Sequence, residues 1–238
     1  MSGVTQFSTS HSGFWSALLP MGEAYVRAEN ANLARFAPPH FSIAPAAQRG
    51  AVNEGAFLIF EEASGLSRRP SSFTGTEIEK ILGRAIEYVA RLRQSPSDAS
   101  EEITDAGKID AILIAERLST FFGSEAASVV VRPKLPGCGW LSDAEGDVLT
   151  GSTLYEVKAG QRHFRLADLR QVLCYCALDF SSKRFGIREV SLVNPRAGTV
   201  IREDLESLCR KLSGAGSDDV LGEIINYVSE PLSRYQGS

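Results

Sequence analysis

The sequence predicts an α/β fold, in which a mainly helical region precedes a central mixed sheet flanked by helices. Three observations lead to this prediction. From Lys108 on, the apolar segments follow the order α-β-β-β-α-β. Most of the segments before that point have helical spacing. The 238 residues, 43% of them hydrophobic and 23% charged, suit one large domain or one domain with an accessory region. We therefore expect an accessory region over residues 1–105 and the sheet domain, with C-terminal helices, over 106–238.

The N-terminal elements follow from spacing and from proline. Residues 1–12 are rich in Ser and Thr and predict a loose end. Residues 14–36 have helical spacing, and Pro20 either bends this helix or starts a new one. A Pro-rich loop comes next. The run GAFLIFEE over residues 55–62 predicts a short strand.

Two longer helices follow a second linker. One begins at Thr76, where Thr76 and Glu79 have the spacing of a capping box. The other covers residues 108–123 and ends at Gly123, a residue that is common just after a helix.

The rest of the chain supplies the sheet and the closing helices. Strands are expected over residues 128–135 and in a hairpin that turns near Gly151 and Ser152. A helix over 165–182, a strand–turn–strand unit over 188–204 and two final helices complete the order.

The hairpin carries the most informative residues. Asp147 ends one apolar run, and Glu156 and Lys158 alternate with apolar residues in the next. Residues two apart on a strand point to the same face, so the Lys158 ammonium is expected beside the Glu156 carboxylate. Asp147 and Glu156 could hold a divalent metal, with the main-chain carbonyl of Val157 as a third ligand. Lys158 would then orient the attacking water or stabilise the charged transition state, as a metal-dependent phosphodiesterase requires.

A less specific interpretation of this hairpin stays open. A Glu/Lys pair two residues apart is common on solvated sheet faces. Here the flanking residues are apolar, which favours a sheet end or a functional site. A helical pattern with Gln171 and Tyr175 on one face follows directly. This combination makes a chance pairing less plausible.

Together these residues resemble the PD-(D/E)xK nuclease superfamily, with Gly146 where the motif has proline. QVLCY, from Gln171 to Tyr175, is similar to the QxxxY motif of its RecB-like branch. The resemblance covers roughly residues 108–205 and implies a restriction-endonuclease-like αβββαβ core. The iron–sulfur cysteine pattern of some members of that branch is absent.

The resemblance also implies roles for individual residues. Asp147 and Glu156 would bind Mg²⁺ or Mn²⁺, and Lys158 would be catalytic. Gln171 and Tyr175 would support the site or the DNA, although Tyr175 could equally be a core residue. Glu116 is the best candidate for the acidic residue of the family's first helix, with an ordinary surface position as the alternative.

Charge limits how the chain could contact a nucleic acid. The net charge is −4, with 11 Lys/Arg against 15 Asp/Glu in residues 1–126 and 14 of each in 127–238. This balance excludes non-specific coating of nucleic acid through bulk charge. A local basic segment is the candidate contact, or else a solvated loop; it comprises Arg162, His163, Arg165 and Arg170. We expect DNA as the substrate, with RNA left open, and a protein partner or a homodimer.

The four cysteines form no CxxC pair, so we expect reduced, mostly buried thiols and no zinc or iron–sulfur site. No signal peptide and no membrane span are evident, which favours a cytoplasmic protein. The leading hypothesis is a metal-dependent DNA nuclease, with defence against phage or mobile DNA as a setting suggested by analogy. The alternatives are a non-catalytic DNA-binding or assembly subunit on the same fold, and an unrelated α/β protein with an accidental motif.

Overall fold

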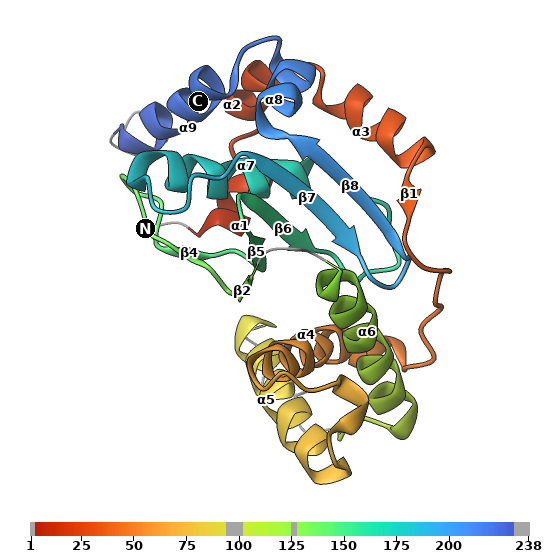
Figure 1. Cartoon of the computed structure of the whole chain (residues 1–238). Coiled ribbons are helices and arrows are strands. Elements are labelled where there is room, and N and C mark those ends of the chain that lie inside the picture. The colour runs from red at the N-terminus through yellow and green to blue at the C-terminus, as the bar shows by residue number, and fades with distance from the viewer. Residues whose placement is uncertain (1–2, 94–101, 125–127, 231–238) are drawn as a thin grey trace.

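The fold is built around one six-stranded mixed sheet, seen in a computed structural model that describes residues 3–93, 102–124 and 128–230 (Figure 1). The strand order is β1-β8-β7-β6-β5-β2, and β6 and β7 form the parallel pair, while the other neighbours are antiparallel. The strands are β1 (Ala34–Arg35), β2 (Val129–Val131), β5 (Val148–Thr150), β6 (Thr153–Val157), β7 (Glu189–Asn194) and β8 (Thr199–Asp204), and a separate small sheet joins β3 (Lys134–Leu135) and β4 (Ala144–Glu145). The predicted α/β class with a helix-flanked mixed sheet is confirmed.

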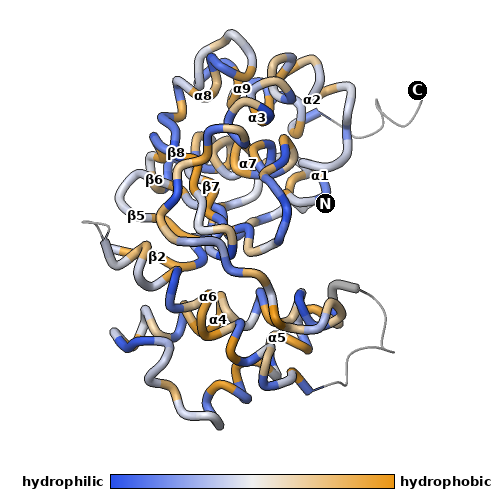
Figure 2. Tube along the Cα trace, turned by 90° about the vertical axis from the view of Figure 1, so that its right-hand side faces the viewer, coloured by the Kyte–Doolittle hydropathy of each residue, from blue (hydrophilic) through white to orange (hydrophobic). Residues whose placement is uncertain are grey.

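Helices cover both faces of this sheet. The helices are α1 (Val4–Thr9), α2 (Ser12–Leu18), α3 (Gly22–Ala31), α4 (Arg49–Gly65), α5 (Gly75–Arg93), α6 (Asp105–Gly123), α7 (Leu166–Ser182), α8 (Leu205–Ser213) and α9 (Ser217–Ser229). In Figure 1, α4, α5 and α6 lie below the sheet, and α7, α8 and α9 lie above it. The hydrophobic segments of both groups are visible in Figure 2, most clearly in α7 and α4.

The two hydrophobic cores follow the alternation of strand residues. Leu154 packs into the core that contains α7, and its neighbour Tyr155 packs into the core that contains α4 and α6. Successive strand side chains point to opposite faces, so each residue of β6 can be assigned to one core by parity. This parity later decides which face carries the functional side chains.

The residues before the expected division near residue 105 are mainly helical but also supply β1 to the sheet, and both cores draw on residues before and after it. Phe7 of α1 and Trp15 of α2 are fully buried in the core with α7. Ile59 of α4 is buried in the core with α6. The helices before residue 105 therefore contribute side chains to both hydrophobic cores.

Two sequence predictions in this region are wrong. Residues 1–12, expected to be loose, contain α1, which is held by the burial of Phe7. The run 55–62, expected to be a strand, lies inside helix α4. Its buried residues recur three or four apart and extend beyond the run, which is helical periodicity that the β-prone composition concealed; they are Val52, Gly55, Ala56, Phe57, Ile59, Phe60 and Ala63.

The capping box of α5 lies two residues before its predicted position. The Thr74 hydroxyl accepts from the Glu77 N–H, and a Glu77 carboxylate oxygen accepts from the Thr74 N–H. The Thr76–Glu79 assignment was therefore wrong, although the reciprocal arrangement is the predicted one. The break near Pro20 is confirmed, since α2 ends at Leu18 and α3 begins at Gly22.

The predicted hairpin is present and positions the candidate site. Strands β5 and β6 pair with Thr150 opposite Thr153, so Gly151 and Ser152 form a two-residue turn. Gly151 has a φ of +56°, a conformation that glycine adopts without strain. The chain then passes through α7 to β7, which pairs in parallel with β6. From α6 on, the order α6, β2, β5, β6, α7, β7 matches the predicted α-β-β-β-α-β series.

Candidate active site

The three residues singled out in the hairpin point to one face of the sheet. Side chains an even number of residues apart on a strand point to the same face. Glu156 and Lys158 therefore share the face of Leu154, and Asp147 shares the face of Leu149. Both leucines pack in the core that contains α7. The Lys158 ammonium lies 2.6 Å from Glu156 Oε1. The Asp147 Oδ2 oxygen accepts from the Val157 N–H at 2.6 Å. The hairpin therefore brings Asp147 to the strand end that carries Glu156 and Lys158.

Helix α7 completes this group from the opposite side. The Lys158 ammonium donates to Gln171 Oε1 at 2.9 Å, and Gln171 Nε2 donates to the Tyr175 hydroxyl at 2.8 Å. Gln171 and Tyr175 are one helical turn apart, so one face of α7 presents both. Tyr175 also packs in the core that contains α7, as the alternative interpretation of this residue expected. The polar chain thus runs from Glu156 through Lys158 and Gln171 to Tyr175.

A second carboxylate on α7 faces the ammonium from further away. Asp168 Oδ1 lies 3.9 Å from Lys158 Nζ. Asp168 also accepts from the Arg165 N–H at the start of α7 and forms two 2.7 Å contacts with the Arg162 guanidinium. Burial acts to raise the pKa of Asp168, but the donors from Arg162 and Arg165 outweigh it and lower the pKa. Asp168 is therefore a charged anchor for the loop that follows Lys158.

In the central group, by contrast with Asp168, the surroundings raise the pKa values of the acids. Glu156 is only 3% exposed, and burial, followed by the charge of Asp147, raises its pKa to about 8. Burial of the Asp147 carboxyl raises its pKa as well, although the residue as a whole is only half-buried at a cleft wall. Burial acts to lower the pKa of Lys158, but the Glu156 carboxylate reverses this and the pKa is raised. At neutral pH the Lys158 ammonium keeps its proton and the pair of acids also retains one, because full ionisation of both would place more negative charge there than the surroundings stabilise.

One oxygen of this group makes no hydrogen bond. Within the described part of the chain, Glu156 Oε2 is buried and has no donor. A buried, unpaired carboxylate oxygen costs free energy unless a cation or a donor compensates it. Glu156 Oε2 and Asp147 thus form an oxygen-rich, negatively charged position with a deficit of positive charge.

This position fits a hard divalent cation. Mg²⁺ and Mn²⁺ prefer carboxylate and carbonyl oxygens, and Mg²⁺ commonly uses one or two carboxylates and keeps several waters. The described residues contain no group of three or more His, Cys, Asp or Glu side chains able to hold a metal ion. A cation at this position would have to draw its further ligands from main-chain carbonyls such as that of Val157 and from water.

A cleft of about 620 Å³ opens beside this group. Its wall includes Asp147, Val157, Gln171 and Tyr175, so four of the sequence-predicted site residues border one space. Reactive groups at the wall of such a concavity are the usual arrangement in enzymes.

The cleft also contains an acid that the sequence reasoning missed. Glu54 of α4 lines it, and the charge of Glu54 contributes to raising the pKa of Asp147. Arg132 joins the walls of the cleft, because its guanidinium donates to Glu54 and Glu61 and its N–H donates to the Asp147 carbonyl. Glu54 directly precedes the run 55–62 that was assigned to a strand, so the sequence reasoning did not place it on a helix face.

Glu116, proposed as the first-helix acid, is not brought to this group. Its carboxylate accepts from the Ser71 N–H at 2.7 Å, in the turn before α5. It does not line the cleft, and Glu54 does. The helical acid that lines the cleft is therefore Glu54 of α4, and not Glu116 of α6.

The four basic residues proposed as a nucleic-acid contact have separate environments. Arg162 is paired with Asp168, and Arg165 is exposed at the start of α7. Arg170 is half-buried with its guanidinium 5.7 Å from the centroid of Trp15, and burial lowers its pKa. His163 is exposed. They do not form one continuous patch of free charge.

The cysteines and the described helices bear on the expectations about thiols and membrane spans. All four thiols are free; Cys174, Cys176 and Cys209 are buried and Cys138 is half-buried. Among the described helices, none has the length and apolar character needed to span a bilayer. Three comparisons with known proteins, by family, by sequence and by structure, find nothing that this chain matches.

Proposed function

We propose that this protein is a metal-dependent nuclease that hydrolyses DNA phosphodiester bonds on a restriction-endonuclease-like fold. The observation that carries the proposal is the convergence of Asp147, Glu156 and Lys158 at one strand end, beside a cleft. The order of elements from α6 to β7 supports the fold assignment. Chance pairing of Glu and Lys on a solvated sheet face does not account for a carboxylate that is 3% exposed.

Each residue has a part in this proposal. Asp147, Glu156 and the Val157 carbonyl would hold Mg²⁺ or Mn²⁺, which supplies positive charge to the phosphate and acidifies a bound water. Lys158 places an ammonium beside Glu156, where it orients the attacking water or stabilises charge in the transition state. Gln171 fixes the ammonium through its carbonyl oxygen and is itself held by Tyr175.

The charge of the cleft supports a requirement for metal. Its lining includes four acids, against Arg132 as the basic residue; the acids are Glu54, Asp143, Glu145 and Asp147. A DNA phosphate would be repelled from this wall unless a divalent cation reversed its sign. The same charge balance supports a protein partner or a second copy of the chain that contributes basic surface to DNA binding.

The test is cleavage of supercoiled plasmid, linear duplex and single-stranded DNA in Mg²⁺, Mn²⁺ or EDTA. We expect the wild type to cleave with either metal and not in EDTA. Lys158→Ala should lose at least about 100-fold in rate, since it removes a charge that acts on the transition state. Lys80→Ala, which removes an exposed lysine from α5, is the matched control and should cleave like the wild type. Equal rates for Lys158→Ala and the wild type would contradict the proposal.

A non-catalytic DNA-binding or assembly subunit is the second proposal. It is favoured by the engagement of the Lys158 ammonium with Glu156, Gln171 and Asp168, which could be a purely structural arrangement. Binding of Mn²⁺ without cleavage of any DNA form, with and without candidate partners, would support this second function.

A further inference from the structure

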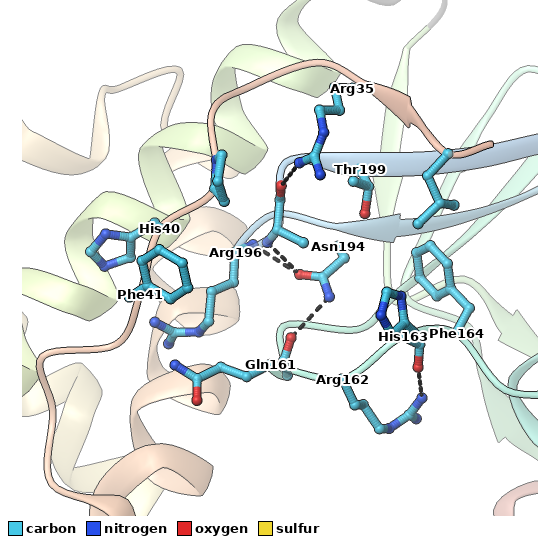
Figure 3. Close-up of a pocket in the computed structure, with 14 residues that line it drawn as sticks. Arg35, His40, Phe41, Gln161, Arg162, His163, Phe164, Asn194, Arg196 and Thr199 are labelled. Atoms are coloured by element: carbon cyan, nitrogen blue, oxygen red, sulfur yellow. Dashed lines mark hydrogen bonds between the residues drawn. The ribbon is translucent and has the colours of Figure 1, made fainter. Parts of the chain in front are cut away.

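A second, smaller pocket lies on the other side of the loop that follows Lys158. Ala159 borders the cleft, and Gly160 to Phe164 border this pocket of about 150 Å³ (Figure 3). The chain spans at most about 3.6 Å per residue, so Lys158 and Gly160 are no more than roughly 7 Å apart. The same loop therefore borders both spaces within two residues of Lys158.

Aromatic side chains stand on two sides of the small pocket. Phe41 lies on one side and His163 and Phe164 lie on the other, with Asn194 between them (Figure 3). The Phe41 side chain is among the most exposed large hydrophobic groups, at 77%. A cavity of about 150 Å³ with apolar walls accommodates a single aromatic ring. The size and the walls thus suit a flat ring that stacks on the exposed side chain of Phe41.

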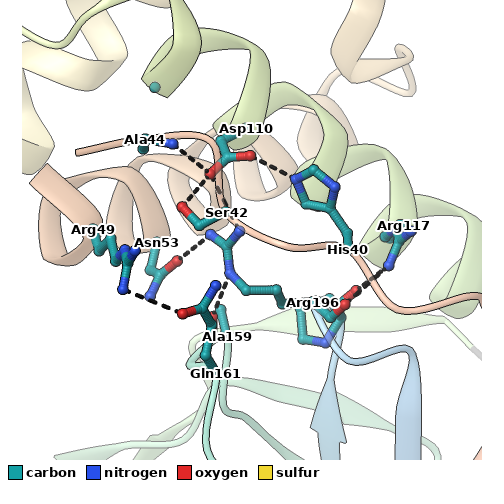
Figure 4. A network of polar contacts seen from close by, with 12 residues as sticks. His40, Ser42, Ala44, Arg49, Asn53, Asp110, Arg117, Ala159, Gln161 and Arg196 are labelled. Atoms are coloured by element: carbon teal, nitrogen blue, oxygen red, sulfur yellow. Dashed lines mark hydrogen bonds and ion pairs between the residues drawn. The ribbon is translucent and has the colours of Figure 1, made fainter. Parts of the chain in front are cut away.

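The segments that carry these rings are fixed by the fold. The neighbours of Phe41 are anchored, because His40 Nε2 contacts Asp110 Oδ1 at 2.5 Å and the Ser42 hydroxyl donates to Asp110 Oδ2 (Figure 4). Asn30 clamps the backbone of Phe164 by donating to its carbonyl and accepting from its N–H. An exposed aromatic ring on an anchored segment loses little conformational freedom when it stacks on a ligand.

The charge of the small pocket differs from that of the cleft. No Asp or Glu occurs among its described lining residues, whereas four acids line the cleft. Arg35 and His163 border it, and Arg35 uses one of its five N–H donors on the Ala197 carbonyl. This lining tolerates the phosphates that accompany a nucleobase.

We propose that the small pocket binds an unpaired nucleobase of a DNA strand, stacked on Phe41 and bordered by the exposed His163, near the phosphodiester at Lys158. Proteins that hold single strands commonly stack bases on aromatic side chains and neutralise the backbone with basic ones. This inference rests on the proposed function and deepens it, because it makes single-stranded or splayed DNA the preferred substrate.

The experiment measures binding without cleavage. The probe is a single-stranded DNA oligonucleotide that carries 2-aminopurine, a fluorescent base, titrated with the full-length protein in Ca²⁺ in place of Mg²⁺ or Mn²⁺, because Ca²⁺ also takes oxygen ligands and supplies the positive charge that the acidic cleft needs. Stacking quenches this fluorescence. We expect quenching by the wild type and a loss of affinity of about 5-fold or more in Phe41→Ala, the range that one base–aromatic stack supports. His163→Ala should weaken binding in the same direction.

Ile43→Ala is the matched control. Ile43 is 55% exposed, lies on the same anchored segment and does not line the pocket. It should bind like the wild type, and the melting temperatures of both variants should be unchanged because both side chains are exposed. Absence of quenching by the wild type, or equal affinity of Phe41→Ala and the wild type, would overturn the inference.

The outcomes separate the two proposals. If the wild type cleaves DNA and Phe41→Ala cleaves single strands equally well, the nuclease stands and the base pocket fails. If quenching depends on Phe41 in both the wild type and Lys158→Ala while no cleavage occurs, the pocket stands and the nuclease fails.

Discussion

Two buried acid–base clusters on either side of the Ala159–Phe164 loop differ in how well their charges are compensated. Asp110 is 0% exposed and accepts hydrogen bonds from His40, Ser42 and Arg196 (Figure 4). Burial acts to raise the pKa of Asp110, but these donors lower it to about 2. Glu156 is nearly as buried, yet it has Lys158 as its donor and its pKa is raised to about 8.

The difference separates a cluster whose charges are matched within the protein from one whose charges are not, and it supports the proposed metal site at the second. Around Asp110, the Arg196 guanidinium also donates to the Ala159 carbonyl and to Asn53, so it joins α4, α6 and the loop. Its charges and donors are matched within the protein, as a structural joint requires. The Asp147–Glu156 pair lacks matching donors within the described residues, so its second negative charge needs a proton or a bound cation to compensate it.

The largest expected effect is on cleavage by Glu156→Gln. This variant keeps the shape of the side chain and removes a charge that the metal requires, so we expect a rate loss of about 10²–10³-fold or more. The measurement is the initial rate of plasmid cleavage in Mn²⁺. Glu145→Gln, an exposed acid of the same cleft, is the control and should lose less than about 10-fold. A Glu156→Gln variant as fast as the wild type would remove the distinction between the clusters.

The second effect is on stability and belongs to the other cluster. Asp110→Ala leaves the buried Arg196 charge unpaired, which should lower the free energy of unfolding by about 3–5 kcal/mol. Asp105→Ala, at an exposed position on the same helix, should cost less than about 1 kcal/mol. Urea denaturation of both variants checks this. If the Asp110 variant were as stable as the control, the cluster would not be the joint described here.

The pH dependence of stability separates the clusters further. The folded-state pKa of Glu156 is above its unfolded value, so the folded form holds a proton between about pH 4.5 and 8, and stability falls as pH rises through that window. Removing the titration in Glu156→Gln should make the metal-free protein more stable than the wild type at pH 8.5, by roughly 1–3 kcal/mol. The advantage should shrink toward pH 5.

The contribution of Asp110 to stability changes with pH in the opposite direction. Its folded-state pKa is lowered to about 2, so its contribution is present above about pH 4 and is lost as pH falls through 2.

Thermal unfolding of the wild type and of Glu156→Gln from pH 5 to 9 in EDTA measures the loss of stability expected from Glu156. Parallel curves for the two proteins would show that Glu156 is not an uncompensated acid.

The smallest effects concern the residues behind Lys158. Gln171→Ala should reduce cleavage by about 10-fold without abolishing it, because the ammonium keeps Glu156 as a partner. Tyr175→Phe removes one hydrogen bond to Gln171 and should cost about 2- to 5-fold. Steady-state rates with Mg²⁺ check both. Global unfolding of Gln171→Ala would show instead that the residue is structural.

Local patterns predicted the central site, because its parts are close in sequence. The two-residue turn and the strand alternation place Asp147, Glu156 and Lys158 together, and one helical turn links Gln171 to Tyr175. These relations need only the periods of a strand and a helix.

The remaining features depend on contacts between distant segments. Glu54 reaches the cleft from α4, and Arg132 holds it there across 78 positions of sequence. The anchoring of Phe41 depends on Asp110. The sequence identified Arg162 as a candidate basic contact, but it did not predict the ion pair of Arg162 with Asp168. Composition also concealed the helical period of α4, and with it the position of Glu54 at the cleft.

The measurement that tests the uncompensated charge most directly is calorimetric titration of the full-length protein with Mn²⁺ at pH 6.5 and 8.0. Buffers of different ionisation enthalpy would be used, so that released protons are counted. We predict one site, proton release at pH 6.5, and an affinity roughly 15-fold higher at pH 8.0, because Glu156 must lose its proton to bind the ion. Asp110→Asn should behave like the wild type, and Glu156→Gln should lose the site. No binding, or binding that is the same in Glu156→Gln, would contradict the account.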